Sequence, residues 1–276
     1  MRLFLSGLRK LVRRPATWVT FGLLNALIVV IVLAVGATID NRAGTGSAAV
    51  ARTAAMKELL TFPGAYDRML DFVVGFGGLL AMIYGAAVAG SEWSWGTFKS
   101  VVARGESRVG YVLGTYASVV VLVAVGLLAS FAVAVVAATV GAHMAGISTS
   151  GMGDSATLGG LPELLLRGGL AMAEQTALGF AIATLARSQL AGIGVGIAFY
   201  FGESFATLLL PDIVKYMPFA VATASLRVGT NTADAALGGG STSSLPPDQA
   251  ILLVVAWLVG SMLVAAAFSR RAEIAG

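Results

Sequence analysis

Three runs of uncharged, mostly apolar residues constrain this chain more than any other feature of its sequence. Residues 15–39, 72–91 and 109–142 contain no Asp, Glu, Lys or Arg. Each run reaches the roughly 20 residues that an α-helix needs to cross a hydrocarbon core of about 30 Å. Backbone groups in hydrocarbon must find hydrogen-bond partners within the protein. The sequence therefore predicts an all-α integral membrane protein.

The composition agrees with this class. The 276 residues are 57% hydrophobic and 12% charged, with a mean hydropathy of +0.87, whereas a soluble domain has roughly 25% charged residues. There is no Cys and one His, so a disulfide framework, a thiolate metal site and His-rich metal chemistry are excluded. The net charge of +4 does not imply a nucleic-acid partner, because membrane proteins place such an excess in cytoplasmic loops.

Apolar periods and turn residues predict six transmembrane helices and several shorter elements. The expected spans are about 16–37, 71–90, 109–140, 162–186, 189–210 and 249–269. Pro162 and Glu163 suit a first helical turn, and residues 187–189 form a very short turn. Residues 48–60 read as a short helix, residues 212–228 as one or two short external helices broken at Pro218, and residues 238–244 as a flexible link. The third uncharged run is about 50 Å long as a helix, so it projects beyond the bilayer or breaks near its end.

Residues 1–14 predict an amphipathic basic helix that lies in the membrane interface. At helical spacing, one face gathers apolar residues and the other gathers cations, which suits anionic lipid headgroups. The apolar members are Phe4, Leu5, Leu8, Leu11 and Val12; the cations are Arg2, Arg9, Lys10, Arg13 and Arg14. A secretory signal peptide is the competing interpretation, with a faint cleavage motif at residues 34–36. The 25-residue run after Arg14 favours an uncleaved anchor.

The distribution of Lys and Arg predicts the orientation. If the N-terminus is inside, residues 1–14, 91–108, 187–189 and 270–276 are cytoplasmic and hold 11 basic residues. The longer outside loops, at 38–70, 141–161 and 211–248, then hold 6. This bias predicts a multi-pass protein of the cell membrane with both termini in the cytoplasm.

Residues 91–108 form a charged island between two of the uncharged runs. The segment contains Glu92-x-x-x-Gly96-Thr97 and, further on, Arg104-x-x-x-Arg108. With the basic N-terminal helix, the tight turn at Arg187-Ser188 and the broken segment after the fifth span, this pattern resembles the permease subunits of type-2 ABC (ATP-binding-cassette) exporters. In that family the island forms a cytoplasmic coupling helix that contacts the ATPase. The family often has Pro and Lys where this chain has Gly105 and Gly114.

The resemblance implies a transport subunit that works with partners. It implies a second permease copy or close homologue, two copies of a separately encoded ATPase that binds ATP and Mg, and a hydrophobic or amphiphilic substrate. It also implies a path between the copies, lined mainly by the second and fifth spans. The predicted ATPase-coupling residues are Glu92, Trp93, Trp95, Gly96, Thr97, Phe98 and Lys99. Trp93, Trp95 and Phe98 offer aromatic anchors, although Trp residues also suit the headgroup level.

No catalytic motif appears in the sequence. It lacks G-x-x-x-x-G-K-[ST], H-E-x-x-H and G-x-S-x-G, so it predicts neither an enzyme nor an ATP-binding chain, and neither a cofactor nor a metal is expected on it. Within the expected spans, Gly192 and Gly196 suit a close helix contact, either between copies or within one.

Three ionisable residues inside the expected spans are candidates for function: Arg167, Glu174 and Glu203. By helix rise, Arg167 and Glu203 both lie about 8 Å from the outer boundary, which predicts an ion pair between them, either as an outer gate or as a permanent structural link. The alternative function is a secondary transporter, or a membrane protein without transport activity, that uses Glu174 and Glu203. No internal repeat of the kind common in secondary transporters is visible.

Overall fold

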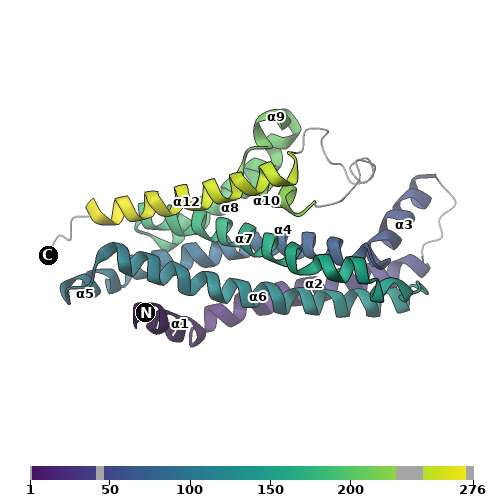
Figure 1. Cartoon of the computed structure of the whole chain (residues 1–276), viewed down its shortest axis with the longest axis horizontal. Helices are drawn as coiled ribbons and strands as arrows, with labels where there is room; N and C mark the ends of the chain where they lie inside the picture. The colour runs from purple at the N-terminus through teal and green to yellow at the C-terminus, as the bar shows by residue number, and fades with distance from the viewer. Residues whose placement is uncertain (1, 42–46, 228–244, 272–276) are drawn as a thin grey trace.

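The computed structural model describes residues 2–41, 47–227 and 245–271, so the predicted link at 238–244 lies outside the described residues. These residues form a bundle of helices without strands in the described ranges (Figure 1). Six helices are long and apolar enough to cross a membrane, which confirms the predicted number of spans. They are α2 (Pro15–Asn41), α4 (Ala65–Ser94), α6 (Arg108–Met144), α7 (Ser155–Ala186), α8 (Gln189–Leu209) and α12 (Pro247–Arg271).

The shorter elements follow the predicted breaks. They are α1 (Arg2–Val12), α3 (Ser47–Leu60), α5 (Thr97–Ala103), the 3-10 turn η1 (Ser150–Gly153), α9 (Pro211–Val214) and α10 (Pro218–Leu226). Proline begins both α9 and α10, because its fixed φ and missing N–H suit the first helical turn. Figure 1 places α1 and α5 at one end of the bundle and α3 at the other.

The second and fourth spans differ most from their predicted bounds. The fourth begins at Ser155, seven residues before the expected start, and Pro162 lies inside the helix. Asp154 is its N-cap: the carboxylate accepts hydrogen bonds from the Thr157 hydroxyl at 2.6 Å and from the Thr157 backbone N–H at 2.9 Å. These two hydrogen bonds hold the pKa of Asp154 below its usual value. The second span, α4, extends to Ser94, so Glu92 and Trp93 lie on its last turn. The predicted length of the third span is realised as one unbroken 37-residue helix, α6.

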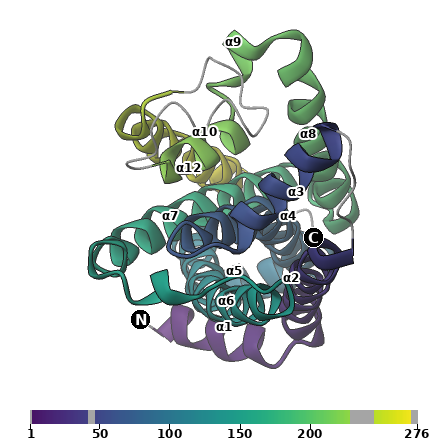
Figure 2. The same ribbon diagram turned by 90° about the vertical axis from the view of Figure 1, so that its right-hand side faces the viewer.

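Helices α4 and α7 pack closely in the middle of the bundle. In the view of Figure 2, they lie between α10 and α12 on one side and α6 and α1 on the other. Glycines set this spacing. A Cβ at Gly179 would collide with the Met82 carbonyl oxygen, and one at Gly85 would lie 2.5 Å from the Thr176 carbonyl oxygen. The absence of these side chains lets the two backbones approach.

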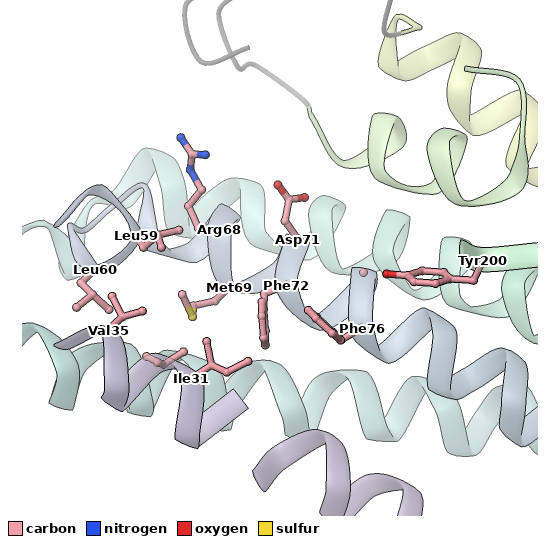
Figure 3. Close-up of a pocket in the computed structure, with 12 residues that line it drawn as sticks. Ile31, Val35, Leu59, Leu60, Arg68, Met69, Asp71, Phe72, Phe76 and Tyr200 are labelled. Carbon is pink, nitrogen blue, oxygen red and sulfur yellow. The ribbon is translucent and has the colours of Figure 1, made fainter. Parts of the chain in front are cut away.

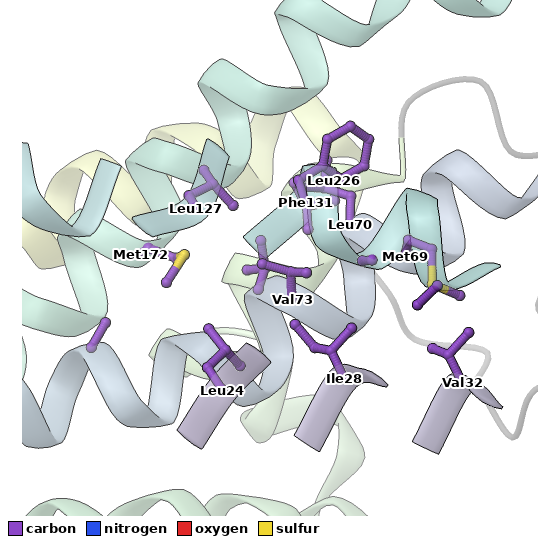
Figure 4. Packing of buried hydrophobic residues seen from close by; sticks show 14 of the residues in the cluster. Leu24, Ile28, Val32, Met69, Leu70, Val73, Leu127, Phe131, Met172 and Leu226 are labelled. Carbon is purple, nitrogen blue, oxygen red and sulfur yellow. The ribbon is translucent and has the colours of Figure 1, made fainter. Parts of the chain in front are cut away.

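Apolar side chains from several helices fill the core (Figure 4). Leu24, Ile28 and Val32 of α2 face Met69 and Val73 of α4. Leu127 and Phe131 of α6, Met172 of α7 and Leu226 of α10 complete this layer.

The fifth span carries the two glycines that the sequence could assign either way. A Cβ at Gly192 would meet Ala183 of α7, and one at Gly196 would lie 2.7 Å from the Met82 methyl group of α4. Both glycines therefore pack inside one subunit. The opposite face of α8 is apolar and exposed, with Leu190, Phe205, Leu208 and Leu209 each more than two-thirds accessible.

Candidate functional site

The junction between α4 and α5 lies at the end of the bundle that also holds α1 (Figure 1). Helix α4 is capped by Trp95, and Gly96 follows with φ of 67° before α5 begins at Thr97. That left-handed conformation carries no steric cost for glycine, which explains the sharp turn here.

Glu92 is the centre of a polar network at this junction. Its side chain is 6% exposed, and its Oε1 lies 2.6 Å from Lys10 Nζ and 3.4 Å from Arg14 Nη2. Its Oε2 accepts a hydrogen bond from the Tyr111 hydroxyl at 2.5 Å. A buried carboxylate is tolerated when cations and donors surround it in this way. Glu92 thus links α4 to α1 and to α6.

Arg14 strengthens the same link from the break between α1 and α2. Its Nη1 donates to Ser91 Oγ at 3.0 Å, and its guanidinium lies 5.1 Å from the centre of the Trp95 ring. Stacking of a guanidinium on an indole adds a favourable electrostatic contact to the ion pair.

Phe98 holds α5 against the bundle. It is 1% exposed and stacks on Trp93 with ring centroids 4.3 Å apart. The Tyr111 ring lies 6.1 Å away on α6. Arg187, at the turn between α7 and α8, places its guanidinium over Trp93 and over Phe268 of α12. Phe98 therefore ties α5 to α4 and α6, and Trp93 of α4 connects this aromatic cluster to α12 and to the end of α7.

The structure divides the predicted coupling residues into two groups. Glu92 and Phe98 are buried within the chain. Phe98 is therefore not accessible as the aromatic anchor that the sequence predicts, and the Glu92 carboxylate is enclosed by partners from its own chain. Trp95 is 68% exposed, and Lys99 is also exposed. Trp93, Gly96 and Thr97 are intermediate. The exposed residues of α5 and of the two helix caps that flank it, hereafter the α5 outer face, are Trp95, Lys99, Ser100, Ala103 and Arg104.

The predicted pair between Arg167 and Glu203 does not form. Arg167 instead bonds Glu163 at 2.8 Å and Asp248 at 3.4 Å. Glu203 accepts from the backbone N–H groups of Phe219 at 3.3 Å and Ala220 at 2.6 Å. The prediction rested on the depth of each residue in the membrane. Depth does not say in which direction around the helix a side chain points. Arg167 pairs with Glu163, one turn earlier on the same helix, whereas Glu203 caps the N-terminus of α10.

Glu174 lies in the most buried part of α7. It is fully buried, and neither carboxylate oxygen has a hydrogen-bond partner within the described residues. The neighbouring Gln175 Oε1 is also without one and packs against Gly78 of α4. The two predicted intramembrane carboxylates therefore have different environments: Glu203 is satisfied by backbone donors and Glu174 is not.

Sequence reasoning missed the residues that complete the network. Lys10 and Arg14 were assigned to lipid headgroups, and Tyr111 was not singled out. A signal was present for the two cations, because a carboxylate next to an apolar run needs a positive partner and the N-terminal helix offers the densest set. No local signal indicated Tyr111, which is 19 residues from Glu92.

The fold defines a multi-pass helical membrane protein. Within the described residues, no group of three or more His, Cys, Asp or Glu side chains could hold a metal ion. A family model for a protein of unknown function (DUF2705) matches residues 26–272. Because this match covers most of the sequence, the chain belongs to the DUF2705 family. A comparison with curated proteins found no match.

Proposed function

We propose that this chain is the permease subunit of an ATP-driven exporter of the type-2 ABC class. In this proposal α1 is the interfacial elbow helix, α5 is the cytoplasmic coupling helix, and both termini are cytoplasmic. A separately encoded ATPase, present in two copies, binds ATP and Mg. A second copy of this chain, or a close homologue, completes the transmembrane unit, and the substrate is hydrophobic or amphiphilic.

The observation that carries the proposal is the way α5 is held. Phe98 attaches α5 to Trp93 of α4 and Tyr111 of α6, and the Glu92 network and Trp93 connect that end of α4 to α1, α6 and α12, while the α5 outer face stays accessible. Because α5 is held in this way, a displacement of α5 would move the spans connected to it together. The exposed side chains of Trp95, Lys99 and Arg104 can supply the aromatic and cationic contacts typical of a protein interface.

Purification of the intact chain from its own membranes in a mild detergent tests the proposal. We expect an ATPase subunit to copurify and the complex to hydrolyse ATP. The double variant Trp95→Ala with Lys99→Glu should lower the copurified activity at least fivefold without changing the yield of the chain. Trp18→Ala is the matched control, because Trp18 is 64% exposed on α2 and lies outside the α5 outer face. The absence of an ATPase from the wild-type preparation would refute the proposal.

The environment of Glu174 favours a second candidate, a transporter driven by an ion gradient through intramembrane carboxylates. An unpartnered buried carboxylate suits a residue that takes up and releases a proton. A transport assay in sealed vesicles distinguishes the two candidate functions. Transport by an exporter requires ATP inside the compartment that the ATPase faces, whereas transport by the second candidate continues without ATP and stops when the proton gradient is collapsed.

A further inference from the structure

A cavity of about 370 Å³ opens near the α3 end of the bundle, away from the α5 outer face (Figures 1 and 3). Its floor is apolar, with Ile31 and Val35 of α2 facing Phe72 of α4. Leu59 and Leu60 of α3 close one end. Pockets of this size and lining suit small organic molecules with a substantial apolar part.

Aromatic rings line one side of the cavity. Phe72 and Phe76 lie one turn apart on α4 with ring centroids 4.9 Å apart. Tyr200 reaches toward Phe76 from α8 (Figure 3). The faces of such rings carry negative potential, so a cation placed among them is attracted in addition to the contact that its apolar groups make.

Asp71 supplies a carboxylate to the same cavity. Figure 3 shows Asp71 and Arg68 projecting to the same side of α4, which forms the polar edge of the cavity. Arg68 is engaged with Glu58 at 2.8 Å. Asp71 makes no hydrogen bond and no ion pair within the described ranges, although it is only partly exposed.

Charged side chains of both signs act on Asp71. They are Arg227 and Arg68, which favour its anionic form, and Asp67, which opposes it. A carboxylate near the start of a transmembrane helix is costly to desolvate, and each cation that approaches it lowers that cost. A ligand cation that enters the cavity would therefore be stabilised beside Asp71.

We propose that this cavity binds a hydrophobic organic cation, with the apolar body against Ile31, Val35 and the aromatic rings and the charge beside Asp71. This binding site goes beyond the proposed exporter function. It is measured on the chain alone, without an ATPase, so the failure of either proposal leaves the other standing.

Equilibrium dialysis of the detergent-purified chain against radiolabelled tetraphenylphosphonium, with empty micelles as the blank, tests the site. Tetraphenylborate is the matched competitor, because it has the same shape and the opposite charge. We expect one saturable site for the cation that tetraphenylborate does not displace at equal concentration. Asp71→Asn should weaken the cation affinity by about tenfold through loss of the charge, and Tyr200→Leu by about threefold through loss of the ring. Asp212→Asn, at a carboxylate that is 82% exposed, is the control for charge alone and should leave binding unchanged.

A filling variant tests the same cavity while keeping Asp71. Gly75 lines the cavity, and a Cβ added there meets no atom within 4 Å. Gly75→Leu should therefore fold normally and abolish binding. Gly22→Leu adds the same side chain at an equally open position outside the cavity and should bind like the wild type. Equal binding of the two ions, or unchanged cation binding in both Asp71→Asn and Gly75→Leu, would overturn the proposal.

Discussion

The carboxylate of Glu92 lies 2.6 Å from the ammonium of Lys10, although 82 residues separate them in the chain. This contact joins the last turn of α4 to the N-terminal helix and is reinforced by Arg14 and Tyr111. The contact therefore joins α1 to the junction between α4 and α5, two segments that are far apart in the sequence but lie at the same end of the bundle.

Loss of the Glu92 charge should destabilise the protein. Glu92→Gln leaves Lys10 and Arg14 without their carboxylate, and we expect a cost of about 1–3 kcal/mol, because both cations retain some access to water. The midpoint of thermal unfolding in detergent measures the effect. Glu58→Gln removes a more exposed ion pair and should cost less than about 1 kcal/mol. Adding Lys10→Met to Glu92→Gln should recover part of the lost stability. Equal destabilisation by Glu92→Gln and Glu58→Gln would contradict a special role for Glu92.

Truncation of Phe98 should be far more damaging to stability than truncation of Trp95. Phe98 is 1% exposed and Trp95 is 68% exposed. Phe98→Ala leaves a cavity and should cost about 3 kcal/mol or more, whereas Trp95→Ala should stay within about 0.5 kcal/mol. The two thermal midpoints give the comparison directly. If Trp95→Ala proved the more destabilising variant, the division between buried support and the α5 outer face would be incorrect.

Removal of the Glu203 carboxylate should loosen the start of α10. The side chain accepts from two backbone N–H groups there, so Glu203→Ala should cost about 1–2 kcal/mol, as loss of a helix N-cap does. Hydrogen exchange at the amides of Phe219 and Ala220, followed by mass spectrometry, should accelerate. Glu203→Gln keeps an acceptor oxygen and should have a smaller effect. Ser204→Ala, at an exposed neighbour, is the control, and unchanged exchange in Glu203→Ala would argue against capping.

A methyl group at Gly179 should disturb the central helix pair. It would collide with the backbone oxygen of Met82, so Gly179→Ala should force α4 and α7 apart and cost about 1–3 kcal/mol. Gly194 lies on α8, where a Cβ meets no atom within 4 Å. Gly194→Ala should therefore be neutral or slightly stabilising, since alanine is the better helix former. The fraction of monodisperse protein and its thermal midpoint would show the contrast, and equal behaviour of both variants would exclude close packing at Gly179.

The sequence by itself determined the elements of this protein, because the signals are local. The apolar runs and the turn residues between them specify six spans, and Pro211 and Pro218 specify where α8 ends and α10 begins. The short polar sequence at Arg187 and Ser188, between two apolar runs, specifies the turn there. The start of α7 also had a local signal, because Asp154 is a good N-cap residue. The prediction missed it because it placed Pro162 in the first turn of the helix.

Only the tertiary structure decided which side chains meet. Position along a span gives the depth of a residue but not its rotation about the helix or the course of a short helix elsewhere. Arg167 and Glu203 have similar predicted depths, yet one pairs along its own helix and the other caps α10. Glu92 and Phe98 are polar and aromatic residues of a charged island, yet both are buried, because α1 and α6 bring their partners to the same end of the bundle. Such contacts depend on how the helices pack together, which no local pattern records.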